Sequence, residues 1–125
     1  MKPKLGRKYS RQQISKMLGG QTHHYLPFKN GEVLCGCFIV SPEKNPGAPE
    51  EVLFGTGPVV GDMAEMVYDQ GSPISIFIFR CFGQWEYIGD YRCVDLSRDS
   101  ELLKTKMKAY PERGKIAGVL RFEKV

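Results

Sequence analysis

The sequence predicts one α+β domain whose strands form a strongly curved mixed sheet or a small open β-barrel, with short flanking helices. Its 125 residues suffice for one hydrophobic core and are too few for a second independent one. Apolar residues make up 42% and charged residues 26% of the chain, as in globular proteins. The apolar runs are short and strand-like, and they do not alternate with long helices as in a parallel sheet.

The N-terminal part predicts a basic, flexible arm over residues 1–9, ahead of a single domain over 10–125. Ser10 and Gln13 have the spacing of a capping box, in which each side chain bonds the other residue's backbone N–H. Apolar residues at helical intervals follow, and two glycines then stop the pattern. The sequence therefore predicts a short helix over 11–18.

Strands dominate the rest of the chain. The run 33–40 is apolar almost throughout, which predicts a central strand buried on both faces. In order, the predicted segments are a surface loop over 21–29, a turn at Asn30-Gly31, the strand over 33–40, a loop over 41–50, a strand over 51–54, a glycine-rich turn over 55–62, one or two helical turns after it, a hairpin of strands 74–80 and 84–93 around Phe82-Gly83, a helix over 98–108 and a closing strand over 115–123.

Charge is distributed unevenly along the chain. Residues 1–31 contain seven Lys or Arg and no Asp or Glu, whereas residues 32–125 contain eleven Lys or Arg against fourteen Asp or Glu. A cationic segment on a mildly acidic body is typical of proteins that contact a polyanion such as a phosphate backbone, and is equally typical of a solvated tail. The residues expected to contact a nucleic-acid backbone are Lys2, Lys4, Arg7, Lys8, Arg11 and Lys16.

Neither a metal site nor a cofactor is predicted. Cys35, Cys37, Cys81 and Cys93 lie in apolar, strand-like runs without a C-x-x-C spacing, so we expect buried free thiols. Adjacent histidines such as His23-His24 rarely point at one ion. No signal peptide or apolar run long enough to span a membrane is found, so a cytoplasmic protein without membrane partners is expected.

The stretch from Gly55 to Asp62 carries three glycines at positions 55, 57 and 61. Its spacing and Pro58 exclude a dinucleotide-binding loop. Two interpretations remain: a turn that lets a planar ligand approach the main chain near Asp62, or a structural turn in which Asp62 caps the following helix. No nucleophile with a defined general base is present, so a catalytic residue is not predicted.

Tyr25 lies in a polar loop beside Gln21, which makes it difficult to place in a core. An aromatic face, amide donors and a nearby carboxylate are suited to a nucleobase, which needs stacking on its plane and hydrogen bonds at its edge. These groups therefore make a nucleobase a reasonable ligand.

Four motifs follow one another in a distinctive order. They are Leu18-Gly19-Gly20-Gln21, the run from Phe54 to Asp62, Ile76-Phe77-Ile78-Phe79-Arg80, and Trp85-Glu86-Tyr87-Ile88-Gly89-Asp90-Tyr91. This order resembles the SRA domains found beside HNH nucleases in bacterial modification-dependent restriction proteins. The resemblance covers about residues 10–123, and it departs from the family where Phe54 replaces a tyrosine and one extra residue separates Gly57 from Gly61.

The resemblance implies a PUA-like curved barrel that binds double-stranded DNA with a modified cytosine and flips that base into a pocket, without catalysis. An effector nuclease would act in trans. Asp62 would accept hydrogen bonds from the base edge, and Gln21 would lie toward the DNA. The implied pocket residues, together with Tyr25, are Phe54, Gly55, Thr56, Gly57, Gly61 and Asp62. Two alternatives stay open: a protein-interaction or scaffold domain, and an RNA-binding PUA-like module.

Overall fold

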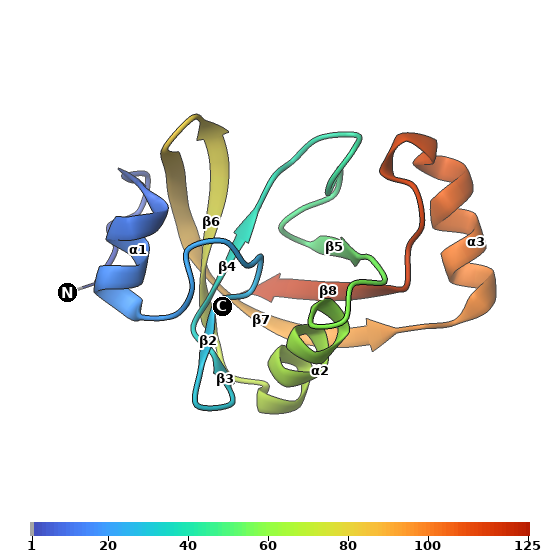
Figure 1. Cartoon of the computed structure of the whole chain (residues 1–125), viewed down its shortest axis with the longest axis horizontal. Helices are drawn as coiled ribbons and strands as arrows, with labels where there is room; N and C mark the ends of the chain where they lie inside the picture. The colour runs from blue at the N-terminus through green and yellow to red at the C-terminus, as the bar shows by residue number, and fades with distance from the viewer. Residues whose placement is uncertain (1) are drawn as a thin grey trace.

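The computed structural model describes residues 2–125, and within them an open, mixed six-stranded sheet is flanked by three α-helices (Figure 1). The elements are β1 (Lys8–Tyr9), α1 (Arg11–Leu18), β2 (Phe28–Lys29), β3 (Glu32–Val33), β4 (Cys35–Phe38), β5 (Glu51–Phe54), α2 (Val60–Gln70), β6 (Ile74–Cys81), β7 (Gln84–Ser97), α3 (Ser100–Ala109), the 3-10 helix η1 (Pro111–Arg113) and β8 (Gly118–Lys124). The predicted α+β class is confirmed.

The main sheet has the strand order β4-β6-β7-β8-β5, with β1 paired to β7 beside this path. Its curvature arises in β7, where Ile88 and Val94 are extra residues relative to the partner strands. Such bulges bend a strand and increase its twist. One long strand can therefore form the hairpin with β6 at one end and pair with β8 at the other. This geometry agrees with the predicted strong curvature.

Strand β4 is buried on both faces, as its apolar run predicts, but it lies at the edge of the sheet rather than at its centre. Cys35 and Cys37 face a cluster that includes Ile14 of α1 and Trp85. Phe38 faces the main core on the other side. The edge itself is covered by the preceding loop, because the Cys37 N–H donates to the carbonyl of Tyr25 at 2.8 Å. The two clusters therefore cover the faces of β4, and the loop covers the edge that has no neighbouring strand.

The hydrophobic core is divided among three clusters. The largest lies between the sheet and α2 and includes Met63 and Val67 of that helix. A second lies under α1, and a third lies under α3 and includes Leu53 and Ile116. Helices α1 and α3 are at opposite ends of the molecule, with the sheet between them (Figure 1). The surface near α1 is thus well separated from that near α3.

The N-terminal segment, predicted to be a flexible arm, lies partly on the sheet. Lys8 and Tyr9 form β1 opposite Glu86 and Trp85 of β7. This edge of β7 is available there because β8 pairs with β7 only from Tyr91 onward. Backbone hydrogen bonds from the Gly6 N–H to Tyr87 and between Tyr87 and Arg7 extend the contact. The arm therefore has a defined position against the domain.

Helix α1 begins and ends as predicted, with both hydrogen bonds of the capping box present at Ser10 and Gln13. Replacing Ser10 by alanine removes the acceptor that lies 3.1 Å from the Gln13 backbone N–H. We expect the free energy of unfolding to fall by about 1 kcal/mol, measured by urea denaturation. Ser100→Ala is the control, since Ser100 is an exposed first-turn residue of α3. Equal stability of the two variants would contradict the role of the cap.

Candidate functional site

The glycine-rich turn joins β5 to α2, and the helix starts earlier than predicted. Its N-cap position is Val59, which provides no side-chain hydrogen bond. Asp62 lies inside the first turn and is exposed. The interpretation of Asp62 as the helix cap is therefore wrong, because helical geometry begins at Val60, two residues before it. The carboxylate near the helix N-terminus is instead favoured by the helix dipole.

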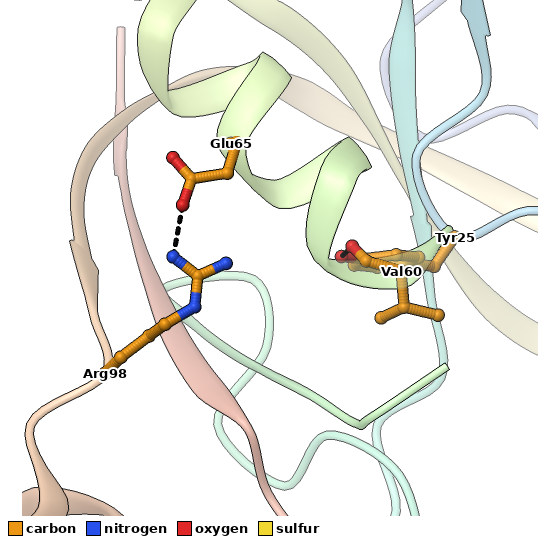
Figure 2. Close-up of polar contacts among 4 residues, drawn as sticks. All are labelled: Tyr25, Val60, Glu65 and Arg98. Carbon is orange, nitrogen blue, oxygen red and sulfur yellow. Dashed lines mark hydrogen bonds and ion pairs between the residues drawn. The ribbon is translucent and has the colours of Figure 1, made fainter. Parts of the chain in front are cut away.

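Two polar contacts hold α2 in place, one at its first residue and one further along the helix (Figure 2). The Tyr25 hydroxyl donates a hydrogen bond of 2.7 Å to the carbonyl of Val60, and burial raises the pKa of Tyr25, which keeps the phenol protonated as a donor. The Arg98 guanidinium pairs with Glu65 and lies 5.6 Å from the centre of the Phe54 ring. Helix α2 is thus held by the loop between α1 and β2 and by the residue that follows β7.

A cavity of about 280 Å³ opens beside this turn. Its walls are mostly apolar or aromatic, with three polar side chains among them. The lining residues are Tyr25, Lys44, Asn45, Leu53, Phe54, Gly55, Val60 and Arg113. A second cavity of about 220 Å³ shares Tyr25, Lys44 and Asn45 and is otherwise lined by Arg11, His23, Cys37, Phe38, Ile39 and Trp85. We refer to the two cavities, which share these three lining residues, as the Tyr25 pocket.

Gly55 lines the Tyr25 pocket although the fold does not require a glycine there. Its φ lies outside the left-handed region, and a Cβ at this position would come no closer than 3.9 Å, to the Lys115 carbonyl. By contrast, Gly20 has φ +84° and a Cβ there would lie 2.8 Å from Pro27. The missing side chain at Gly55 therefore leaves main-chain atoms open to a ligand rather than relieving strain.

A separate cleft of about 310 Å³ lies between the N-terminal segment and α1. Four of its lining residues are cationic and none is acidic. The cationic residues are Lys2, Lys4, Arg7 and Lys16, and the other lining residues are Tyr9, Gln13 and Met17. The segment is folded back by hydrogen bonds from the Arg7 N–H to the Lys4 carbonyl (3.0 Å) and from the Lys4 N–H to the Tyr9 hydroxyl (2.9 Å). We call this surface the cationic cleft, and its charge suits a phosphate backbone.

The structure brings together only some of the residues predicted for each role. Tyr25, Phe54 and Gly55 meet in the Tyr25 pocket. Thr56, Gly57, Gly61 and Asp62 line neither of its two cavities.

Among the predicted backbone contacts, Lys8 is exposed on β1 outside the cationic cleft. Arg11 lines the Tyr25 pocket, where its guanidinium donates to the His24 carbonyl at 2.6 Å. Gln21 is half-buried, and its Oε1 accepts from the Phe28 N–H at 2.9 Å. Gln21 therefore orders the loop in this conformation.

Sequence reasoning missed the polar side chains of the pocket. Asn45 carries a local signal, because Asn-Pro is a turn dipeptide in the loop before β5. Its Oδ1 accepts from the Leu53 N–H at 2.7 Å, which fixes the side chain. Lys44 and Arg113 carry no such signal, since isolated basic residues in loops are ordinary surface residues. Their position in the pocket follows from packing of the loop and η1 against β5.

The cysteines and histidines form no cluster. Cys35, Cys37 and Cys93 are buried free thiols, as predicted, but Cys81 is exposed because the β6–β7 hairpin ends there, beyond the core. Over residues 2–125, no three His, Cys, Asp or Glu side chains come together in the way that a metal site requires. In the same described part of the chain, no helix is both long and apolar enough to cross a membrane.

The fold, an open mixed sheet with flanking helices, is that of SRA domains. The SRA domain of SUVH5, solved with hemi-methylated CG DNA, superposes with a TM-score of 0.64 at 9% identity, covering 98% of this chain and 88% of that one. The modification-dependent restriction endonuclease TagI superposes with a TM-score of 0.59 at 14% identity, covering 98% of this chain and 50% of that one. The sulfur-binding and SRA domains of ScoMcrA, complexed with phosphorothioated DNA, give 0.55 at 13% identity, with 98% and 39% covered. No known family model and no curated protein matches the sequence.

Proposed function

We propose that this domain binds duplex DNA and recognises a modified cytosine that is rotated out of the helix into the Tyr25 pocket, without catalysing a reaction on it. The observation that carries the proposal is the pocket itself, because Tyr25 and Gly55 line the same cavity in an SRA fold. A flipped base needs a stacking surface and nearby polar groups for its edge. Tyr25, Asn45 and the Gly55 main chain supply these.

Two further features support DNA as the partner. The SUVH5 domain was solved with methylated and with hydroxymethylated CG DNA. In this chain, the cationic cleft offers four positive side chains, which would supply affinity for phosphates regardless of sequence. Helix α1 connects the two surfaces, since Arg11 lines the Tyr25 pocket while Gln13 and Lys16 line the cleft. The proposal also includes a separate nuclease that acts on the DNA after this domain has bound it.

Gly55→Ala is expected to abolish discrimination between modified and unmodified duplexes while leaving the melting temperature unchanged. The added methyl group meets no protein atom closer than 3.9 Å, but it occupies the space into which the base would move. The measurement is fluorescence anisotropy at several salt concentrations, with matched duplexes that carry unmodified, methylated or hydroxymethylated cytosine at one position.

Asp62→Ala is the matched control, because Asp62 is exposed and lines neither cavity of the pocket. Loss of discrimination in Asp62→Ala but not in Gly55→Ala would move base recognition to the outer face of the turn. Equal binding of every duplex by the wild type would leave only phosphate contact. A preference for A-form RNA, or no binding to nucleic acid, would favour the RNA-binding or scaffold alternative.

A further inference from the structure

Two arginines that line the Tyr25 pocket have no counter-ion among the described residues. Arg11 and Arg113 make no ion pair with an Asp or Glu in residues 2–125. Each donates from Nη2 to a main-chain carbonyl, that of His24 at 2.6 Å and that of Leu53 at 3.1 Å. Each also has a buried Nε without a hydrogen-bond partner. Arg11 also lies 5.1 Å from the centre of the Trp85 ring, but neither guanidinium group has a negative charge beside it, which is costly for a partly buried cation.

Lys44, Asn45 and Tyr25 add further donor groups to the pocket, and His23 can donate or accept. Lys44 adds a third cation to the lining. The Oδ1 of Asn45 already accepts from the Leu53 N–H, and the amide N–H₂ provides donors for a ligand. The Tyr25 hydroxyl already donates to Val60. Neither cavity is lined by an Asp or a Glu, so no carboxylate is positioned there to accept from an amine.

We propose that the Tyr25 pocket selects a cytosine whose 5-substituent carries negatively charged oxygen, of which a 5-carboxylate is the simplest case. The argument rests on the proposed function and specifies its ligand. A carboxylate would accept charge-assisted hydrogen bonds from Lys44, Asn45 or a guanidinium group. The exocyclic carbonyl oxygen and the unprotonated ring nitrogen of cytosine are also acceptors. A methyl group would use none of this donor capacity.

Phosphate oxygens of the DNA backbone share this chemistry, so the experiment must separate the two sources. Wild-type protein is titrated with one duplex sequence in which a single cytosine is unmodified, 5-methylated or 5-carboxylated, with and without inorganic phosphate as competitor. Trp85, the only tryptophan, lines the pocket and reports its occupation by fluorescence. We expect the 5-carboxylated duplex to bind about tenfold more tightly than the methylated duplex. Inorganic phosphate should not account for this preference.

Two variants test the donor groups of the pocket. Asn45→Asp keeps the acceptor for Leu53 and replaces the N–H₂ donors by oxygen, so the preference for the 5-carboxylated duplex should be lost or reversed. Lys44→Gln, at an exposed position, should weaken that preference without affecting folding. Lys108→Gln on α3 is the control for charge and should preserve the preference.

The outcomes distinguish failure of the carboxylate inference from failure of the proposed function. Tighter binding of the methylated duplex would overturn the carboxylate inference and leave base recognition intact. Equal binding of all three duplexes, with inorganic phosphate suppressing the change in Trp85 fluorescence, would make the pocket a phosphate site and overturn the inference. Equal binding that leaves Trp85 fluorescence unaffected would overturn the proposed function itself.

Discussion

Replacing Gly118 by alanine is expected to destabilise the domain strongly, by about 3 kcal/mol, with a fall in melting temperature of about 10 °C. Gly118 opens β8 directly opposite Phe54 of β5. An alanine Cβ there would lie 2.6 Å from Cε1 and 2.8 Å from Cε2 of the Phe54 ring, far inside van der Waals contact. The ring cannot easily withdraw, because Phe54 is buried and Arg98 lies over it.

Thermal unfolding followed by circular dichroism measures this effect, and a double-mutant cycle identifies its cause. Phe54→Leu removes the ring atoms that collide with the new methyl group. The double variant Phe54→Leu with Gly118→Ala should therefore lose less stability than the sum of the single variants. Additive losses would show that the damage at Gly118 does not arise from the ring. Gly55→Ala, where space is available, is the control for a glycine-to-alanine change near this turn.

Removing three charges from the cationic cleft is expected to cause a large loss of DNA affinity and of its salt dependence. The triple variant of Lys2, Lys4 and Lys16 to glutamine is expected to reduce the slope of log Kd against log salt by about 3, because each phosphate contact contributes about 0.9. These side chains are exposed, so stability should change little. Since backbone contacts position a protein without reading sequence, affinity should fall for all duplexes together. The ratio between modified and unmodified duplexes should stay constant.

The matched control removes three lysines at the other end of the molecule. Lys104 and Lys108 lie on α3, and Lys115 lies just before β8. Helix α3 is at the opposite end from α1 (Figure 1). The triple glutamine variant changes net charge by the same amount and should leave the salt slope unchanged. An equal loss of slope in both variants would indicate attraction by overall charge rather than binding in the cleft.

Local sequence patterns predicted the elements well where neighbouring residues determine the conformation. The capping box at Ser10 defines the start of α1, and the turn at Phe82-Gly83 defines the β6–β7 hairpin. Both depend on hydrogen bonds and backbone angles within a few residues. The order of the strands was less accessible. The run that forms β4 is apolar because a helix and a loop cover it, a pattern that a central strand would also produce.

The candidate site was predicted in part. Tyr25 and Gly55 could be selected because an aromatic ring in a polar loop and a glycine after a strand are unusual locally. Asn45 and Arg113 could not be selected, because each is an ordinary loop or 3-10 residue until the chain brings it beside β5. The role expected of Asp62 depended on where α2 begins. Tyr25 and Arg98 contact α2 at Val60 and Glu65, and they lie 37 and 36 residues from Asp62 in the chain, so these contacts form only when the chain folds.

The sequence by itself determined the α+β class, the strong curvature, the N-terminal helix and the concentration of positive charge before residue 32. These properties follow from composition, periodicity and hydrogen bonds between near neighbours. Only the tertiary structure decided that β4 is an edge strand, that the basic segment folds back into a cleft, and that the pocket contains donors without a carboxylate. Each of these depends on packing between segments that are distant in the chain, which no local pattern encodes.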